Sequence, residues 1–457
     1  MIKINLSEER FDSHQVYYYA LPEPTWARTS EELRVAIREG NYRDALDFIS
    51  TMDEDTVGEP DSHGQTALHW AALCDNEELC NALLQKMDKE AIGLQTKESR
   101  QTALHFAARE NSKKFIKRFM EFEHAKDLAE TEDKFYQTPL HYAVSQGNWE
   151  ICQELYKIMN PQKIILPIEQ ETNQTVLHCA VRARNLKLVQ VLINREDVVT
   201  KLVKMGDNAG QTALHWAVAL GALEICRALY APFQSEGILS SRTKDHKYTV
   251  LHLAVHEKLT DIVRFFTDGS KMSSDLLGKV DKYGQTALHW AAGKGYCEIC
   301  NMLYSKMTPE QICALMDPEG RKQSALHFAV QGKNQEIVKL LLSRDDVAST
   351  LMGLKDEHGQ TALHWAAGTG CGEICKMLYS KMTPEQICAL MDPEGRKQSA
   401  LHFAVQGKNQ EIVKLLLSRD DVASTLVGLQ DEHGQTALDW AKKLHLSNIE
   451  ELLKKVS

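Results

Sequence analysis

One octapeptide, QTALHWAA, recurs without change at 65–72, 285–292 and 360–367. Eleven related copies begin between Gln65 and Gln435, and successive copies start 36 to 38 residues apart. Self-similarity at such a period predicts a solenoid in which each unit contacts only its neighbours. A length of 457 residues would otherwise suggest several globular domains. The repeat predicts one elongated stack instead, and the copies are numbered here as repeats 1 to 11.

Repeat 9 shows what each unit is expected to form. Gly359 supplies a turn position that tolerates positive φ, and Thr361 is placed to cap the N-terminus of a short helix. Gly370 ends that helix, and apolar residues at helical spacing then begin a second one. Because neither helix can bury its apolar stripe alone, stability must come from stacking on the next unit.

With this pattern the sequence resembles ankyrin repeats, whose G-x-TPLH-x-AA-x-x-G-x-x-x-(I/V)-x-x-L-L motif is matched by nearly every copy from about Asp61 onward. The resemblance implies an all-α ankyrin-repeat solenoid of helix–turn–helix units joined by β-turns and loops, curved into a rod. Family units are usually about 33 residues long. The extra residues predict short third helices, with N-termini near Thr308, Thr383 and Asp346.

The repeat also divides the chain. We expect an N-terminal extension at 1–28, a capping half-repeat at 29–60, repeats 1 to 10 at 61–434 and a C-terminal capping repeat at 435–457. The half-repeat opens with the capping-box pair Thr29 and Glu32.

Two further segments have a specific interpretation. Tyr17 to Tyr19 and Trp26 in the extension either cover the apolar flank of the cap or form a docking peptide. Met302 to Leu351 and Met377 to Leu426 are identical over 50 residues, which indicates recent duplication of a two-repeat block.

Ten of the 18 histidines occupy the same motif position, and the last copy carries Asp439 there. The resemblance implies that this histidine bonds the motif threonine and the neighbouring turn backbone, so that it fastens units together and does not catalyse. The pairs expected to do so include Thr66 with His69, Thr212 with His215, Thr286 with His289 and Thr361 with His364.

Cysteines and aromatic residues also fall at repeated positions. Cys80, Cys152, Cys226, Cys300 and Cys375 are interpreted as small buried hydrophobes, although Cys297 and Cys300 have the spacing of a redox or zinc pair. The aromatic row after the motif histidine resembles a stacking platform for bases. Core packing is favoured instead, because the position is apolar in ankyrin repeats and the net charge is −10.

Composition and motif content exclude several classes of function. The excess of 63 acidic over 53 basic residues argues against binding to nucleic acid or anionic membranes. The N-terminus has no signal-peptide pattern, so a cytoplasmic or otherwise intracellular protein is expected, in a host cytosol if the chain is delivered there. No P-loop, GxSxG or HExxH motif occurs, which predicts no enzyme, no cofactor and no metal site.

The remaining candidate site is a surface. In ankyrin proteins the turn tips and the residues just after the first helix line a concave groove that binds partners. By position, the candidates are Arg109, Glu110, Gln146, Arg182, Leu220, His256, Glu257, Tyr283 and Lys294. The predicted function is a monomeric, non-enzymatic scaffold that binds a partner protein. The alternatives are a translocated effector of an intracellular bacterium or parasite, and a regulatory or targeting subunit of a separate enzyme.

Overall fold

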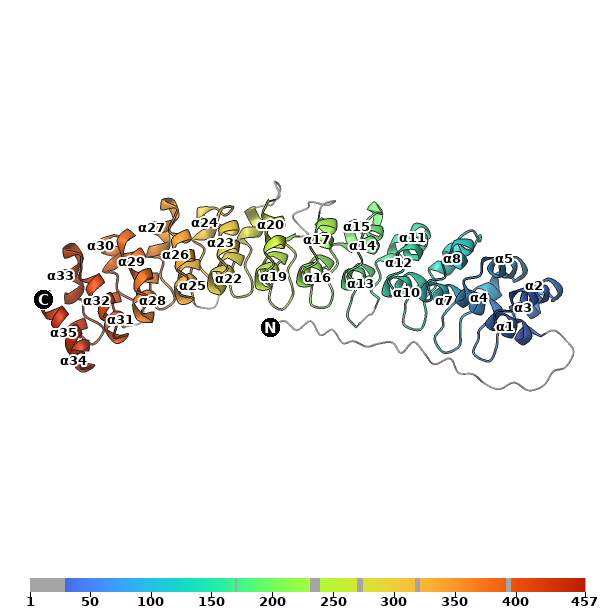
Figure 1. Cartoon of the computed structure of the whole chain (residues 1–457), viewed down its shortest axis with the longest axis horizontal. Helices are drawn as coiled ribbons and strands as arrows, with labels where there is room; N and C mark the ends of the chain where they lie inside the picture. Colours follow the sequence, from blue (N-terminus) through green and yellow to red (C-terminus); the bar gives the residue numbers. More distant parts are fainter. Residues whose placement is uncertain are drawn as a thin grey trace.

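The structure is a computed structural model that describes residues 29–168, 171–230, 239–268, 274–316, 321–391 and 396–456. The described helices form one curved rod with turns along its concave side (Figure 1). This confirms the predicted all-α solenoid. The interpretation of Tyr17 to Tyr19 and Trp26 falls outside the described residues.

Each repeat begins with an inner helix on the concave side (Figure 1). Each is capped by the motif threonine or serine and is rich in alanine, which allows neighbouring inner helices to stack closely. The inner helices are α4 (Ala67–Cys74), α7 (Ala103–Arg109), α10 (Pro139–Ser145), α13 (Val176–Arg182), α16 (Ala213–Ala219), α19 (Val250–His256), α22 (Ala287–Lys294), α25 (Ala325–Gln331), α28 (Ala362–Thr369), α31 (Ala400–Gln406) and α34 (Ala437–Lys443).

A second layer of outer helices lies on the convex side and stacks in the same order. A left-handed residue such as Gly370, at φ 74°, separates each inner helix from its outer helix. The outer helices are α5 (Glu77–Lys86), α8 (Lys113–Phe119), α11 (Trp149–Ile158), α14 (Leu186–Leu192), α17 (Leu223–Tyr230), α20 (Thr260–Asp268), α23 (Cys297–Tyr304), α26 (Gln335–Leu341), α29 (Gly372–Lys381), α32 (Gln410–Leu416) and α35 (Ser447–Lys454).

In nine repeats of the described chain, the added residues form short third helices, as predicted. Thr308 and Thr383 cap two of them, each accepting the backbone N–H of a glutamine at 3.3 Å. The third helices are α6 (Lys89–Ile92), α9 (Ala125–Ala129), α12 (Pro161–Ile164), α15 (Glu196–Leu202), α21 (Ser274–Gly278), α24 (Pro309–Ile312), α27 (Asp345–Gly353), α30 (Pro384–Ile387) and α33 (Asp420–Gly428).

Three helices precede repeat 1: α1 (Ser30–Arg38), α2 (Tyr42–Thr51) and α3 (Glu54–Gly58). At the start of α1, the Thr29 N–H donates to Glu32 at 2.9 Å and the Glu32 N–H donates to Thr29 at 3.3 Å. Helices α1 and α2 stack on α4 and α5. One hydrophobic core runs through all units, from Leu33 to Leu453.

Seven motif histidines join consecutive units. In repeat 1, Nδ1 of His69 accepts the backbone N–H of Thr66 at 3.1 Å and lies 3.1 Å from the Thr66 hydroxyl. Because Nδ1 is an acceptor, the neutral ring carries its proton on Nε2. Nε2 donates to the carbonyl oxygen of Gln101 in repeat 2 at 3.2 Å. The same bond joins His105 to Gln137, His178 to Gln211, His215 to Tyr248, His252 to Gln285, His327 to Gln360 and His402 to Gln435. His289 instead donates to the carbonyl oxygen of Ala314, which follows α24 in its own repeat, at 3.1 Å.

Burial keeps these imidazoles neutral, because a charged ring in the core would lose its hydration. Burial lowers the pKa of six of them to about 4: His69, His105, His141, His215, His289 and His364. Asp439 retains the contacts within its own repeat, since its Oδ2 accepts the Thr436 N–H at 3.0 Å and the Thr436 hydroxyl at 2.8 Å.

An arginine on the convex side joins units that the histidines do not reach. Arg344 precedes α27, and its guanidinium carbon lies 5.7 Å from the ring centroid of Tyr304 in the previous repeat. It donates to the Met307 carbonyl oxygen at 3.3 Å and to Oδ2 of Asp346 at 2.8 Å. The same arrangement recurs at Arg419 with Tyr379, and at Arg195 with Tyr156.

Candidate protein-binding groove

A buried aspartate shapes the turn of repeat 9. Oδ1 of Asp356 accepts the backbone N–H groups of His358 at 3.0 Å and Gln360 at 2.7 Å. Its Oδ2 accepts the indole N–H of Trp365, on the inner helix, at 2.9 Å. One carboxylate thus fixes both the turn and its position against α28. Trp216, Trp290 and Trp440 donate in the same way to Asp207, Asp281 and Asp431, and the Tyr142 hydroxyl donates to Asp133.

The turns are also bonded to one another through their backbones. The Lys97 N–H donates to the carbonyl oxygen of His63 at 2.9 Å, and the Lys134 N–H donates to that of Ser99 at 3.0 Å. The same bond joins Asn208 to Thr172, Lys244 to Ala209, Lys282 to His246, Glu357 to Arg321 and Glu432 to Arg396. The concave face is therefore a preorganised surface, in which turns and inner helices hold each other in place.

The aromatic row lies on this face. Phe106 and Trp216 are buried, with 8% and 7% of their surface exposed, as expected for core packing. Trp70, Trp290, Trp365 and Trp440 are only half-buried. These four side chains pack against the hydrophobic core, as expected, but part of each remains accessible on the concave face.

The predicted groove residues lie in a line along the rod and not in one cluster. Glu110, Gln146, Arg182, Glu257, Tyr283 and Lys294 are exposed, whereas Arg109, Leu220 and His256 are half-buried. All but Tyr283, which is on a turn, lie at the end of an inner helix or just after it. Since repeats are about 10 Å apart, a partner must be extended to contact several of them.

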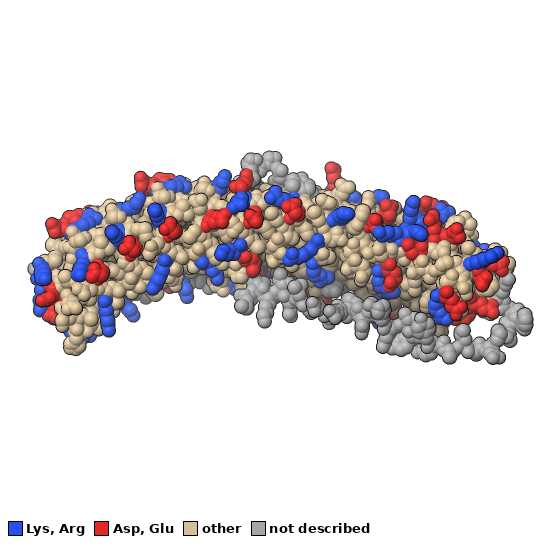
Figure 2. Space-filling view, viewed as in Figure 1, with Lys and Arg blue, Asp and Glu red and all other residues tan. Residues whose placement is uncertain are grey.

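In two of the candidate pairs the side chains contact each other. Nε of Arg109 lies 3.0 Å from Glu110, and its guanidinium carbon lies 4.8 Å from the ring centroid of Phe106. Nδ1 of His256 lies 2.8 Å from Glu257. Elsewhere on the concave side, Lys and Arg side chains project from the lower edge beneath the C-terminal repeats (Figure 2).

The structure adds an exposed aromatic pair that sequence reasoning missed. Phe135 and Tyr136, on the turn of repeat 3, have 60% and 57% of their surface exposed. Tyr136 adopts φ 61°, at the position that Gly284 and Gly359 occupy in repeats 7 and 9. The signal was present in the sequence, where DKFYQ replaces the turn glycine by a bulky residue that disfavours this backbone conformation.

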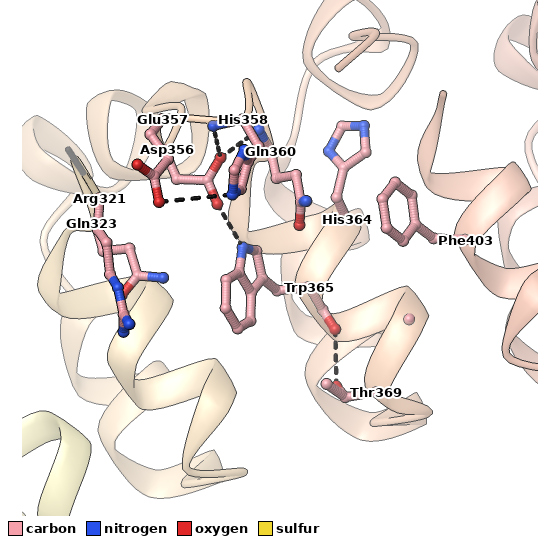
Figure 3. A pocket seen from close by; sticks show the side chains of 11 residues that line it. Arg321, Gln323, Asp356, Glu357, His358, Gln360, His364, Trp365, Thr369 and Phe403 are labelled. Atoms are coloured by element: carbon pink, nitrogen blue, oxygen red, sulfur yellow. Dashed lines mark hydrogen bonds and ion pairs between the residues drawn. The ribbon is translucent and has the colours of Figure 1, made fainter. Parts of the chain in front are cut away.

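A shallow pocket of about 540 Å³ lies on the concave face across repeats 8 to 10. The half-buried Trp365 is at its centre, with Arg321 and Gln323 on one side of the indole and Phe403 on the other (Figure 3). Glu357 and Thr369 also line it. None of the nine groove candidates predicted from the sequence lines this pocket.

The repeated cysteines lie in the core. Burial raises the pKa of Cys80, Cys226 and Cys375 to about 12, and Cys300 is buried while Cys297 is exposed. Within the described ranges, no three His, Cys, Asp or Glu side chains are grouped so that they could hold a metal ion. None of the described helices is long and apolar enough to span a membrane.

Stacked helix pairs joined by hydrogen-bonded turns, with a histidine between units, define the ankyrin class of repeat proteins. Family models for ankyrin repeats match residues 63–93, 88–165, 160–238, 234–314, 310–388 and 382–457. The chain therefore belongs to the ankyrin-repeat family.

Individual relatives match only part of the chain. Inversin of Canis lupus familiaris is 30% identical over 170 residues, which cover 37% of this chain and 14% of inversin. The nuclear factor NF-kappa-B p105 subunit of Gallus gallus is 33% identical over 120 residues, 26% of this chain and 11% of that protein. The matches thus span a small part of these relatives. The crystal structure of the ankyrin repeat domain of Bcl-3 aligns with a TM-score of 0.44 and 27% identity, and covers 54% of this chain and all of that domain.

Proposed function

We propose that this chain is a non-enzymatic scaffold whose concave groove binds a partner protein. The observation that carries the proposal is the preorganised concave face. Its turns are fixed by buried aspartates and joined through their backbones, while side chains such as Arg182 and Lys294 are left exposed. A surface already held in its binding conformation loses little conformational entropy on association. Membership of the ankyrin family, whose repeats generally bind proteins, supports the same function.

The experiment is affinity capture from cell lysate, followed by mass spectrometry. The groove variant Arg109→Glu/Arg182→Glu/Lys294→Glu is compared with the unmodified protein. A matched control, Lys117→Glu/Lys339→Glu/Lys376→Glu, makes the same change in charge at exposed positions on the outer helices α8, α26 and α29. Circular-dichroism melts establish that all three proteins fold.

A partner that is captured by the unmodified protein and the control, but lost from the groove variant, would support binding through the groove. A partner lost from both variants would show that only total charge matters. Equal capture by all three proteins, or no capture, would contradict the proposal. An enzyme activity that co-purifies with the chain would make the chain a regulatory or targeting subunit.

A further inference from the structure

The concave aromatic rings are generally covered by a cation or an imidazole of this same chain. Tyr142, Trp216, Phe328 and Phe403 each contact the motif histidine of the preceding repeat. For four other rings the covering group comes from the end of an inner helix, either in the same repeat or in the preceding unit. Arg38 lies 5.7 Å from the ring centroid of Trp70, Arg109 lies 4.8 Å from that of Phe106, His256 lies 5.3 Å from that of Trp290, and Lys443 lies 5.2 Å from that of Trp440.

Trp365 departs from this pattern. His256 and Lys443 stand seven residues after their motif threonines, and the corresponding residues around Trp365 are Gln331 in repeat 8 and Gly368 in repeat 9. Neither can supply a cation. In the described part of the chain, no cation or second ring lies against the indole of Trp365. Trp216 also has no cation, but its ring is buried.

The surroundings of Trp365 are those of a cation site. Its indole N–H donates to the Asp356 carboxylate at 2.9 Å, which makes the ring more electron-rich and strengthens its attraction for a positive charge. The pocket of about 540 Å³ at this ring has room for a long side chain. Glu357 lines the same pocket, with its Oε1 3.5 Å from Nε2 of His358, and supplies a carboxylate for the charged end of such a side chain (Figure 3).

We infer that the pocket at Trp365 binds an arginine or lysine side chain of the partner protein, stacked on the indole and paired with Glu357. The inference rests on the proposed function and adds the chemistry of one contact. The competing ligand is an anionic side chain paired with Arg321, which also lines the pocket.

The test uses the full-length chain labelled with 5-fluorotryptophan and observed by ¹⁹F NMR. The chain has seven tryptophans, and a Trp365→Phe variant assigns the resonance of Trp365. The probes are N-acetyl-arginine methylamide, its neutral analogue with citrulline, and N-acetyl-glutamate methylamide. The Trp365 resonance should move saturably with the arginine probe, with a Kd on the order of millimolar. It should respond to citrulline at least about ten times more weakly, because citrulline lacks the charge.

The duplicated block supplies a matched pair of variants. Gln331→Arg places a cation over Trp365 in the manner of His256 over Trp290, and it should abolish the response to the arginine probe. Gln406→Arg makes the same change in the identical copy, beside Trp440, which Lys443 already covers. It should leave the response of Trp365 unchanged. Arg321→Gln should preserve or strengthen binding of the arginine probe, because it removes a like charge.

An equal response to arginine and citrulline would overturn the inference, as would a response to the glutamate probe alone that Arg321→Gln removes. The same holds if Gln331→Arg leaves the response to arginine intact. These outcomes are independent of the capture experiment. A partner lost from the groove variant but kept by the outer-helix control would still support the proposed function.

Discussion

The buried histidines predict that acid weakens this protein well before its carboxylates are protonated. Six imidazoles have a pKa of about 4 in the folded chain, whereas an unfolded histidine titrates at about 6.5. Between these values the folded state binds fewer protons than the unfolded state. Stability is therefore complete above about pH 6.5 and is lost as the pH falls towards 4.

Linkage gives the size of the effect. At pH 5 each such histidine has lost about 2 kcal/mol of its contribution to the free energy of unfolding, so six together lose roughly 12 kcal/mol. The loss is distributed along the rod. Asp197, Asp346 and Asp421 have a pKa lowered by hydrogen bonds from neighbouring arginines, so their effect begins only at more acid pH.

Urea unfolding followed by circular dichroism between pH 7.5 and pH 5 measures this dependence. The urea midpoint should fall continuously below about pH 6.5. His215→Gln should lower stability at pH 7.5 and make the pH dependence shallower, because it removes one titrating group. The control His358→Gln/His433→Gln alters two exposed histidines and should keep the original dependence. A midpoint that is constant between pH 7.5 and pH 5 would refute the reasoning.

Three further predictions test other contacts. Asp356→Asn should lower the free energy of unfolding in urea by about 2 kcal/mol, because an amide group in place of Oδ2 cannot accept the indole N–H of Trp365. The control Asp345→Asn, at a side chain that is 98% exposed, should have no measurable effect. Arg344→Ala should lower the free energy of unfolding by about 1–2 kcal/mol in the same assay. Arg344→Lys should be destabilised as well, because lysine lacks the planar fork that reaches both Asp346 and the Met307 carbonyl oxygen. Full stability of the lysine variant would contradict this prediction. With Ellman's reagent, Cys297 should react fastest in the folded protein. Five buried cysteines should react only on unfolding: Cys80, Cys152, Cys226, Cys300 and Cys375. Rapid labelling of these five in the folded protein would contradict their burial.

Most of the fold could be predicted because its information is local. The turn glycine, the capping threonine and the apolar stripe of each unit recur together, so one interpretation applies to every copy. The third helix at Pro309 was predictable for the same reason, since Thr308, Pro309 and Glu310 form a helix start by themselves.

The features that escaped prediction depend on side chains from different units. Arg344 contacts the ring of Tyr304 and the Met307 carbonyl oxygen, 40 and 37 residues earlier in the chain, and no motif marks that pair. The accessible face of Trp365 depends on Gln331 and Gly368 as much as on the tryptophan itself. A residue-by-residue reading treats equivalent tryptophans alike, whereas their neighbours decide which of them is accessible.

The identical block has a consequence for the length of the rod. Because Met302 to Leu351 and Met377 to Leu426 are the same, deleting residues 302–376 would join the chain at matching positions. Repeat 7 would then contact repeat 10, whose residues 398–426 are identical to residues 323–351 of repeat 8. The contacts between units in the shortened rod would therefore be ones that the full-length rod already has. The deletion would therefore shorten the rod by two units, or about 20 Å. The distance between the two ends of the rod would change by this step, and no new contact between units would have to form.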